Sequence, residues 1–107
     1  YSPATPLKLI KGKEILKQKD LSSNYKKQKV ALVVKSETRL RLRKKDQYLL
    51  IDMGSKEELD KIAHNIFNIL RELDKEDIDL ILVEVIEDRQ LGEAIMNRLH
   101  KAAINSI

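Results

Sequence analysis

The sequence predicts a Rossmann-like α/β fold, an open, mainly parallel sheet of four to five strands flanked by helices. Two observations carry this prediction. Short runs of aliphatic and β-branched residues alternate along the chain with longer stretches in which apolar residues recur at spacings of three and four. Parallel neighbours need crossover connections, and helices are the usual crossovers, so this alternation favours a parallel sheet covered on both faces. The chain has 107 residues, 42% of them hydrophobic, which supplies one modest core and therefore one domain.

The first six residues are expected to be extended chain. Pro3 and Pro6 disfavour helix in the residues before them, and the chain opens on Tyr1 rather than on methionine. We therefore interpret residues 1–6 as the stub of an interdomain linker and residues 7–107 as one α/β domain of a longer protein.

Four segments have the character of strands. A strand that is buried on both faces is typically a continuous run of β-branched and aliphatic residues. Residues 29–35 (KVALVVK) are the clearest example, and the same character recurs in residues 7–10, 48–53 and 78–86. These four segments are the predicted strands of the sheet.

Residues 55–75 have the strongest helical pattern, because their apolar residues recur at spacings of three and four. The start of this helix is also signalled. Ser55 can accept a hydrogen bond from the backbone amide of Glu58 while the Glu58 side chain reaches back, which is the reciprocal capping box. Gly54, just before it, frees the turn out of the preceding strand.

Two further helices are predicted. The second long helix spans residues 90–103. It places these apolar residues on one face: Leu91, Ala94, Ile95, Leu99, Ala102 and Ala103. Residues 14–19 are expected to form a short helix, because the Ser and Asn residues at positions 22–24 break the pattern after it.

Charge is distributed unevenly along the chain. Residues 1–54 carry 14 Lys and Arg against 5 Asp and Glu, whereas residues 55–107 carry 7 against 12, so that +9 and −5 give the net charge of +4. The densest basic stretch is residues 39–45 (RLRLRKK), whose alternation would aim Arg39, Arg41 and Arg43 to one side if it were extended. This segment is either a surface for nucleic-acid phosphates or a solvated basic edge, and its lack of an aromatic residue favours the second interpretation.

Acidic residues cluster at the end of the last predicted strand, where open α/β sheets tend to bind ligands. They are Glu84, Glu87 and Asp88. No second carboxylate cluster or histidine can be placed beside them, so we expect exposure to water rather than a metal site or a general base.

Several classes of site are excluded by composition. The chain has no cysteine, which excludes disulfides and thiolate ligands and favours a cytosolic compartment. Its three glycines are too widely spaced for a phosphate-binding loop, so we expect no nucleotide or other cofactor bound by this domain alone. His64 and His100 are expected at the surface. No apolar run approaches the length of a membrane span. We assign no catalytic residue and no metal ligand to the chain.

Segments at both ends of the chain resemble a known family. Tyr1-Ser2-Pro3, followed by Thr5-Pro6-Leu7, opens the chain, and Gly92-Glu93-Ala94-Ile95-Met96-Asn97-Arg98-Leu99 runs into Lys101-Ala102-Ala103 near its end. Together they resemble the C-terminal domain of the two-domain threonylcarbamoyl-AMP synthases. In that family a linker ends in His-Tyr-Ala/Ser-Pro, and the last helix of a Rossmann-like domain carries G-x-A-I-x-N-R-L-x-K-A-A. Residues 63–67 and 70–74 also resemble the family's A-x-N-L-F and L-R-x-L-D turns.

The resemblance implies an activity for the full-length protein rather than for this chain. The family's enzymes are cytoplasmic nucleotidyltransferases that use ATP, magnesium, L-threonine and bicarbonate to make threonylcarbamoyl-AMP. The threonylcarbamoyl group is later placed on the tRNA adenosine next to the anticodon. The chemistry belongs to an N-terminal catalytic domain that is absent from this chain, and that domain is the implied partner.

The resemblance also implies roles for particular residues. The family's linker crosses the catalytic pocket, which makes Tyr1 and Ser2 the expected substrate-binding positions. Gly92, Asn97 and Arg98 are expected to form an interdomain or structural motif. Our hypothesis is that domain and linker act as a lid on the active site. The alternative is a module that binds tRNA or another protein of the tRNA-modification machinery.

Overall fold

Four strands form one all-parallel sheet in the computed structural model, which describes residues 4–17, 25, 27–42, 48–87 and 90–105. The strands are β1 (Leu7–Ile10), β2 (Val30–Lys35), β3 (Leu49–Gly54) and β4 (Leu80–Glu84), and their order in the sheet is β1-β4-β2-β3. The predicted α/β class with a parallel sheet is therefore confirmed. The last strand is shorter than predicted, because residues 78–79 and 85–86 lie outside it.

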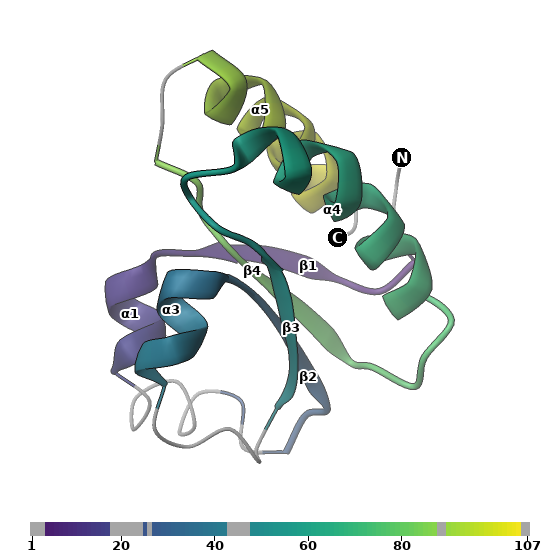
Figure 1. The fold of residues 1–107 in the computed structure, drawn as a ribbon. Helices are drawn as coiled ribbons and strands as arrows, with labels where there is room; N and C mark the ends of the chain where they lie inside the picture. The colour runs from purple at the N-terminus through teal and green to yellow at the C-terminus, as the bar shows by residue number, and fades with distance from the viewer. Residues whose placement is uncertain (1–3, 18–24, 26, 43–47, 88–89, 106–107) are drawn as a thin grey trace.

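Helices cover both faces of the sheet (Figure 1). The short helices α1 (Gly12–Leu16) and α3 (Ser36–Arg41) lie on one face, and the long helices α4 (Leu59–Leu73) and α5 (Gln90–Asn105) lie on the other. This division follows from the connections. The chain moves across the sheet in one direction from β1 to β2 and β3, then turns back to reach β4, and crossovers of constant handedness must change face when they change direction.

The core lies in two layers because side chains alternate across the two central strands. On the side of α4 and α5, Ala31 and Val33 of β2 and Ile81 and Val83 of β4 belong to one buried cluster. The next residues along each strand face the other side, where the second cluster contains Val30, Leu32, Val34, Leu80 and Leu82, together with Ile15 of α1. The apolar runs of the two central strands, β2 and β4, are thus buried on both faces.

Helix α4 begins at Leu59, four residues after the predicted start, and the predicted capping box is wrong. The Glu58 amide donates to the backbone oxygen of Ser55 (2.9 Å), not to its side chain. The Ser55 hydroxyl instead accepts from the Glu57 amide (3.1 Å) and donates to the carboxylate of Glu37 on α3. A long-range partner therefore holds Ser55 in a turn before the helix.

The turn role predicted for Gly54 is confirmed. Its φ is +121°, a backbone conformation that residues other than glycine adopt only with strain. A Cβ at this position would also lie 3.1 Å from Cγ1 of Ile62. This glycine lets α4 pack closely over the end of β3.

The other two predicted helices differ from the structure at their ends. Helix α5 extends to Asn105, and Ile95, Leu99 and Ala102 on its inner face are buried. Ala94, expected on that face, is exposed, because one step of about 100° around the helix separates it from Ile95. Helix α1 begins two residues earlier than predicted, and residues 18–19 of the predicted segment lie outside the described residues. Within the described residues, no helix is long and apolar enough to cross a membrane.

The two layers predict a sharp contrast between two apolar truncations. Ile66 of α4 is fully buried, whereas Leu40 of α3 is 77% exposed. We expect Ile66→Ala to lower the free energy of unfolding by about 2–5 kcal/mol through lost burial and a cavity. We expect Leu40→Ala to change it by less than about 0.5 kcal/mol. Urea unfolding followed by circular dichroism measures both, and equal effects would contradict the assignment of the core.

Candidate functional site: the anchored N-terminal segment and the carboxyl edge

The N-terminal segment is fastened to the domain by its backbone. The amides of Ala4 and Thr5 donate to the two carboxylate oxygens of Asp74 at 3.3 Å and 3.2 Å. Thr5 is buried, and the carbonyl oxygen of Pro6 accepts from the Ile81 amide at 2.9 Å. Residues 4–6 of the predicted linker therefore lie against the end of α4 and the start of β4. Tyr1 and Ser2, the predicted substrate-binding positions, lie outside the described residues.

Asp74 is suited to this anchor by its position. It is the C-cap of α4, where the helix dipole disfavours a negative charge. Two amide donors compensate that charge, and hydrogen bonds to an ionised acceptor are stronger than those between neutral groups. The hydrogen bonds from Ala4 and Thr5 therefore both join the N-terminal segment to α4 and stabilise the Asp74 carboxylate at the end of that helix.

The predicted motif on α5 connects the two long helices. The guanidinium carbon of Arg98 lies 5.8 Å from the centroid of the Phe67 ring on α4, within the range of a cation–π contact. Gly92 is buried in the first turn of α5, and Asn97 is exposed. Met96, between them, accepts a hydrogen bond at its sulfur from the Ile86 amide (3.3 Å), which ties the chain just after β4 to α5. A role of these residues toward the linker stays a prediction.

The expectation that Glu84 is exposed to water is wrong. Its side chain is 2% exposed at the carboxyl end of β4. The carboxylate accepts from the Lys35 amide at 2.9 Å and from the Thr38 hydroxyl at 2.7 Å, and the Lys35 ammonium lies 3.6 Å away. These donors offset the free energy that burying a charge requires. Glu87, by contrast, is exposed, and Asp88 lies outside the described residues.

The sequence contained a signal for this burial. Glu84 stands two and four residues after Leu82 and Leu80, so strict alternation puts it on the same buried face. On that face Gly12, at the start of α1, leaves room for the carboxylate. A Cβ on Gly12 would lie 2.4 Å from Oε2 of Glu84.

Two further carboxylates tie α3 to the carboxyl end of β3. Asp52 accepts from the Ser36 hydroxyl at 2.7 Å and from the Gly54 amide at 2.9 Å. Glu37 accepts from the Ser55 hydroxyl and from the Lys56 amide at 2.9 Å. Desolvation acts to raise the pKa of Glu37, but these hydrogen bonds outweigh it and hold the pKa below its ordinary value. The polar groups at this edge therefore bond mainly to one another.

The extended arrangement considered for residues 39–45 is wrong in its described part. Arg39 and Arg41 belong to helix α3, where two residues are separated by about 200° rather than aligned on one side. Arg39 lies 3.7 Å from the Asp52 carboxylate, and both arginines are exposed. Arg43, Lys44 and Lys45 lie outside the described residues. Within the described residues, no three His, Asp or Glu side chains gather as a metal site, and His64 and His100 are exposed.

Comparison with known proteins places this domain in a family. The sequence-family model of the threonylcarbamoyl-AMP synthase C-terminal domain matches residues 1–104 of this chain. The chain is 47% identical over 45 residues to a threonylcarbamoyl-AMP synthase of Pyrococcus abyssi, 40% over 50 residues to one of Bacillus subtilis, and 49% over 43 residues to one of Schizosaccharomyces pombe. The matched segments cover 42%, 47% and 40% of this chain, but only 13%, 14% and 10% of the three relatives.

Solved structures extend the likeness over the whole fold. The crystal structure of P. abyssi Sua5 complexed with L-threonine has a TM-score of 0.71 and 28% identity, covering 100% of this chain and 30% of that protein. A P. abyssi Sua5 variant with a histidine and a tyrosine replaced by alanine has a TM-score of 0.72 and 29% identity, covering 98% of this chain and 29% of that protein. The chain thus spans less than a third of the solved relatives.

The ties around Glu84 predict a large effect of a single charge removal. We expect Glu84→Gln to lower the free energy of unfolding by about 1–3 kcal/mol, because the amide retains one acceptor oxygen and turns a donor toward Thr38 and Lys35. The exposed Glu87→Gln is the matched control, with an expected change below about 0.5 kcal/mol. Urea unfolding at neutral pH measures both. Equal urea midpoints for the two variants would contradict the structural role assigned to Glu84.

Proposed function

The chain belongs to the family of threonylcarbamoyl-AMP synthase C-terminal domains, and we propose that it is the accessory domain that holds the interdomain linker as a lid over the active site of such an enzyme. The full-length enzyme would make threonylcarbamoyl-AMP from ATP, L-threonine and bicarbonate. A family relative has been solved with L-threonine bound, which supports this substrate. Threonylcarbamoyl-AMP then supplies the threonylcarbamoyl group for tRNA.

One observation carries the lid proposal, namely the anchor that Asp74 forms with the N-terminal segment. The amides of Ala4 and Thr5 and the carbonyl of Pro6 are bound to the domain, so the domain holds the segment from Ala4 to Pro6 in place. A domain that docks on the catalytic domain would thereby place Tyr1 and Ser2 over the pocket. A lid of this kind excludes water from a labile carbamoyl-adenylate without supplying a catalytic side chain.

Asp74→Asn in the full-length enzyme tests the anchor. The substitution keeps the shape of the side chain but removes its charge and one acceptor, and charge-assisted hydrogen bonds contribute about 1.5–3 kcal/mol. We expect retention of threonylcarbamoyl-AMP, and with it the rate of ATP-dependent synthesis, to fall about tenfold. Product retained on the enzyme after rapid gel filtration is the measurement.

Asp60→Asn is the matched control, since Asp60 is exposed in the first turn of the same helix. It makes the same charge change away from the anchor, and wild-type retention is expected. The catalytic domain joined to this chain through its native linker should also retain more threonylcarbamoyl-AMP, and make it faster, than the catalytic domain alone. Tyr1→Ala should remove this difference. Unchanged synthesis and retention in Asp74→Asn and Tyr1→Ala would refute the lid.

A second candidate function, tRNA binding, rests on the neighbouring helices α1 and α3. The two helices pack together on one face of the sheet. Exposed basic residues lie on or beside them, namely Lys11, Lys13, Lys17, Arg39 and Arg41. Such a surface attracts phosphates through a sequence-independent, salt-sensitive interaction.

Charge reversal on this face tests the second candidate. We expect Lys13→Glu combined with Arg41→Glu to weaken tRNA binding by the full-length protein. The slope of the logarithm of the binding constant against the logarithm of the salt concentration should fall by about one unit per lost phosphate contact. Lys61→Glu on α4 is the control on the opposite face. Titration of labelled tRNA at several salt concentrations is the measurement. Absence of tRNA association at low salt would eliminate this candidate.

A further inference from the structure

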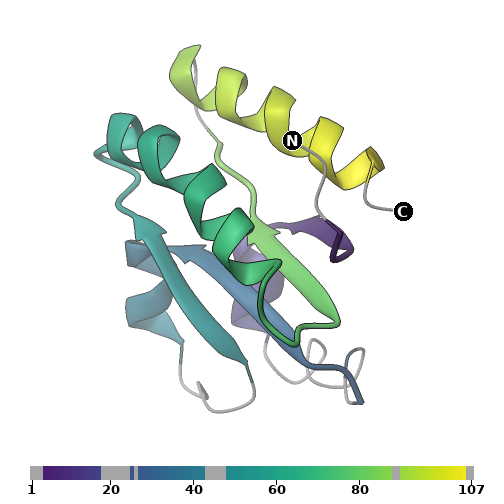
Figure 2. The same cartoon turned by 90° about the vertical axis from the view of Figure 1, so that its right-hand side faces the viewer.

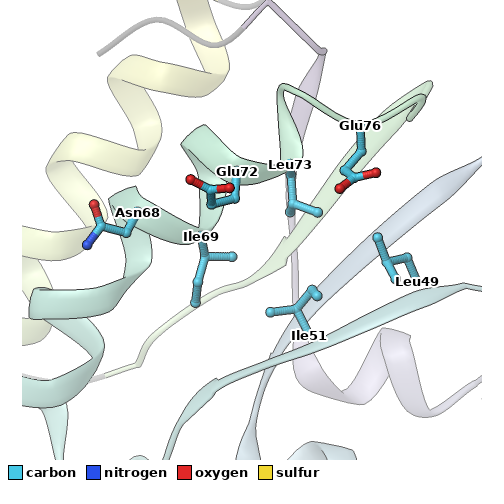
Figure 3. Close-up of a pocket in the computed structure, with 7 residues that line it drawn as sticks. All are labelled: Leu49, Ile51, Asn68, Ile69, Glu72, Leu73 and Glu76. Atoms are coloured by element: carbon cyan, nitrogen blue, oxygen red, sulfur yellow. The ribbon is translucent and has the colours of Figure 1, made fainter.

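A hollow of about 400 Å³ lies between α4 and β3 (Figure 3). Helix α4 runs between β3 and α5 in the turned view of the ribbon (Figure 2). Ile69 and Leu73 point from the helix toward Ile51 and Leu49 of the strand. The hollow therefore has an aliphatic floor made by alternate residues of one strand and by one face of one helix. We call these four residues and the carboxylates of Glu72 and Glu76 at their border the β3–α4 groove.

The strand that forms one wall of the groove is an edge strand. In the order β1-β4-β2-β3, β3 pairs only with β2 among the described strands. The outer side of an edge strand presents backbone amides and carbonyls that can pair with another strand. Leu49 at the start of β3 is 43% exposed, so the apolar wall reaches the surface at this edge.

The border of the groove is acidic at one end. Glu76 lies beside the start of β3, and within the described part of the chain no hydrogen bond or ion pair reaches its carboxylate. Glu72 is paired with Lys75 at 3.2 Å, an exposed pair that contributes little free energy. On the far border, Asn68 accepts from Arg71. Glu76 is therefore the charge available to a cationic partner.

We propose that the β3–α4 groove binds an extended peptide segment, which adds to β3 as a fifth strand and carries a Lys or Arg at the end beside Glu76. Alternate side chains of an added strand point to the same face of the sheet as Leu49 and Ile51, so aliphatic residues at those positions would fill the groove. Strand addition of this kind gives affinity through the backbone and specificity through the side-chain pockets. This inference goes beyond the proposed lid and does not depend on it.

A peptide fits these features better than a second copy of the chain. Two copies joined edge to edge in antiparallel fashion would place their acidic borders at opposite ends of the interface, and the lining of neither groove contains a Lys or Arg that could pair with Glu76 of the other copy. A small ligand would need several convergent polar groups in the lining, and the floor of this groove is aliphatic. Among the described strands β3 pairs only with β2, so its outer side also offers backbone partners that an extended segment can use.

The test uses this chain and a fluorescein-labelled peptide of about six residues, the length of one strand, with valine at alternate positions and two lysines at one end. A second peptide carries the lysines at the other end, so that parallel and antiparallel addition are distinguished. Fluorescence anisotropy measures the affinity. We expect saturable binding of one of the two peptides and weaker binding of the other.

Two pairs of variants locate the binding. We expect Leu49→Ser to weaken it about tenfold through lost apolar contact, while Leu40→Ser, which changes an exposed leucine on α3, has no effect. We expect Glu76→Lys to weaken it about fivefold and Glu57→Lys, an exposed turn residue before α4, to leave it unchanged. Unfolding midpoints equal to wild type exclude misfolding as the cause, since all four positions are exposed.

Backbone pairing is tested with N-methylated peptides. Methylation of the amides that face β3 should abolish binding, and methylation of the intervening amides should not. The proposal is overturned by failure of both peptides to bind, by equal binding to Leu49→Ser and Leu40→Ser, or by equal effects of the two methylation patterns. Self-association of the chain that Leu49→Ser abolishes in sedimentation velocity would also overturn it, because a second copy would then be the occupant.

Discussion

Burying the carboxylate of Glu84 at the end of β4 obliges the neighbouring segments to meet it. The start of α3 supplies the Thr38 hydroxyl and the end of β2 supplies the Lys35 amide and ammonium. A Cβ at position 12, in the turn from β1 into α1, would meet Oε2 of Glu84, so a larger residue there would require this carboxylate to shift. The carboxylate of Glu84 thus joins the end of β4 to the end of β2 and the start of α3, and it lies against the start of α1.

The carboxyl edge of this sheet is consequently occupied by its own side chains. Glu84, Asp52 and Glu37 each bond to groups at the start of α3 or at the end of β2 or β3. Open α/β sheets ordinarily bind ligands at this edge. Here those polar groups serve the fold, whereas the Asp74 anchor of the N-terminal segment lies at the opposite edge, where β1 and β4 begin. This arrangement suits a domain that positions another part of a protein.

Local pattern was sufficient for the four strands and the two long helices, and insufficient for α3 and for the long-range ties. The aliphatic runs identified the strands, and the apolar spacing identified α4 and α5, because both signals depend on neighbouring residues alone. Helix α3 was not predicted, because residues 39–45 were weighed only as a phosphate-binding surface or a solvated basic edge, and the contacts of Glu37 and Thr38 with distant residues have no local signal. The Ser55 capping box failed for the same reason. Asp74 was recognised only as part of a family turn, since nothing local shows that its carboxylate receives the amides of Ala4 and Thr5.

The position of the anchor constrains how the proposed lid can work. An extended chain spans at most about 3.5 Å per residue, so Tyr1 can lie no more than about 11 Å from Ala4. If Tyr1 touches substrate, the catalytic pocket must come within that reach of the C-terminal end of α4. The domain would therefore dock through the edge of the sheet where β1 and β4 begin. The β3–α4 groove extends toward the same end of α4, from Ile69 to Glu76, but opens along β3, whereas the segment from Ala4 to Pro6 leads into β1 at the other side of the sheet, so a peptide bound in the groove need not displace that segment.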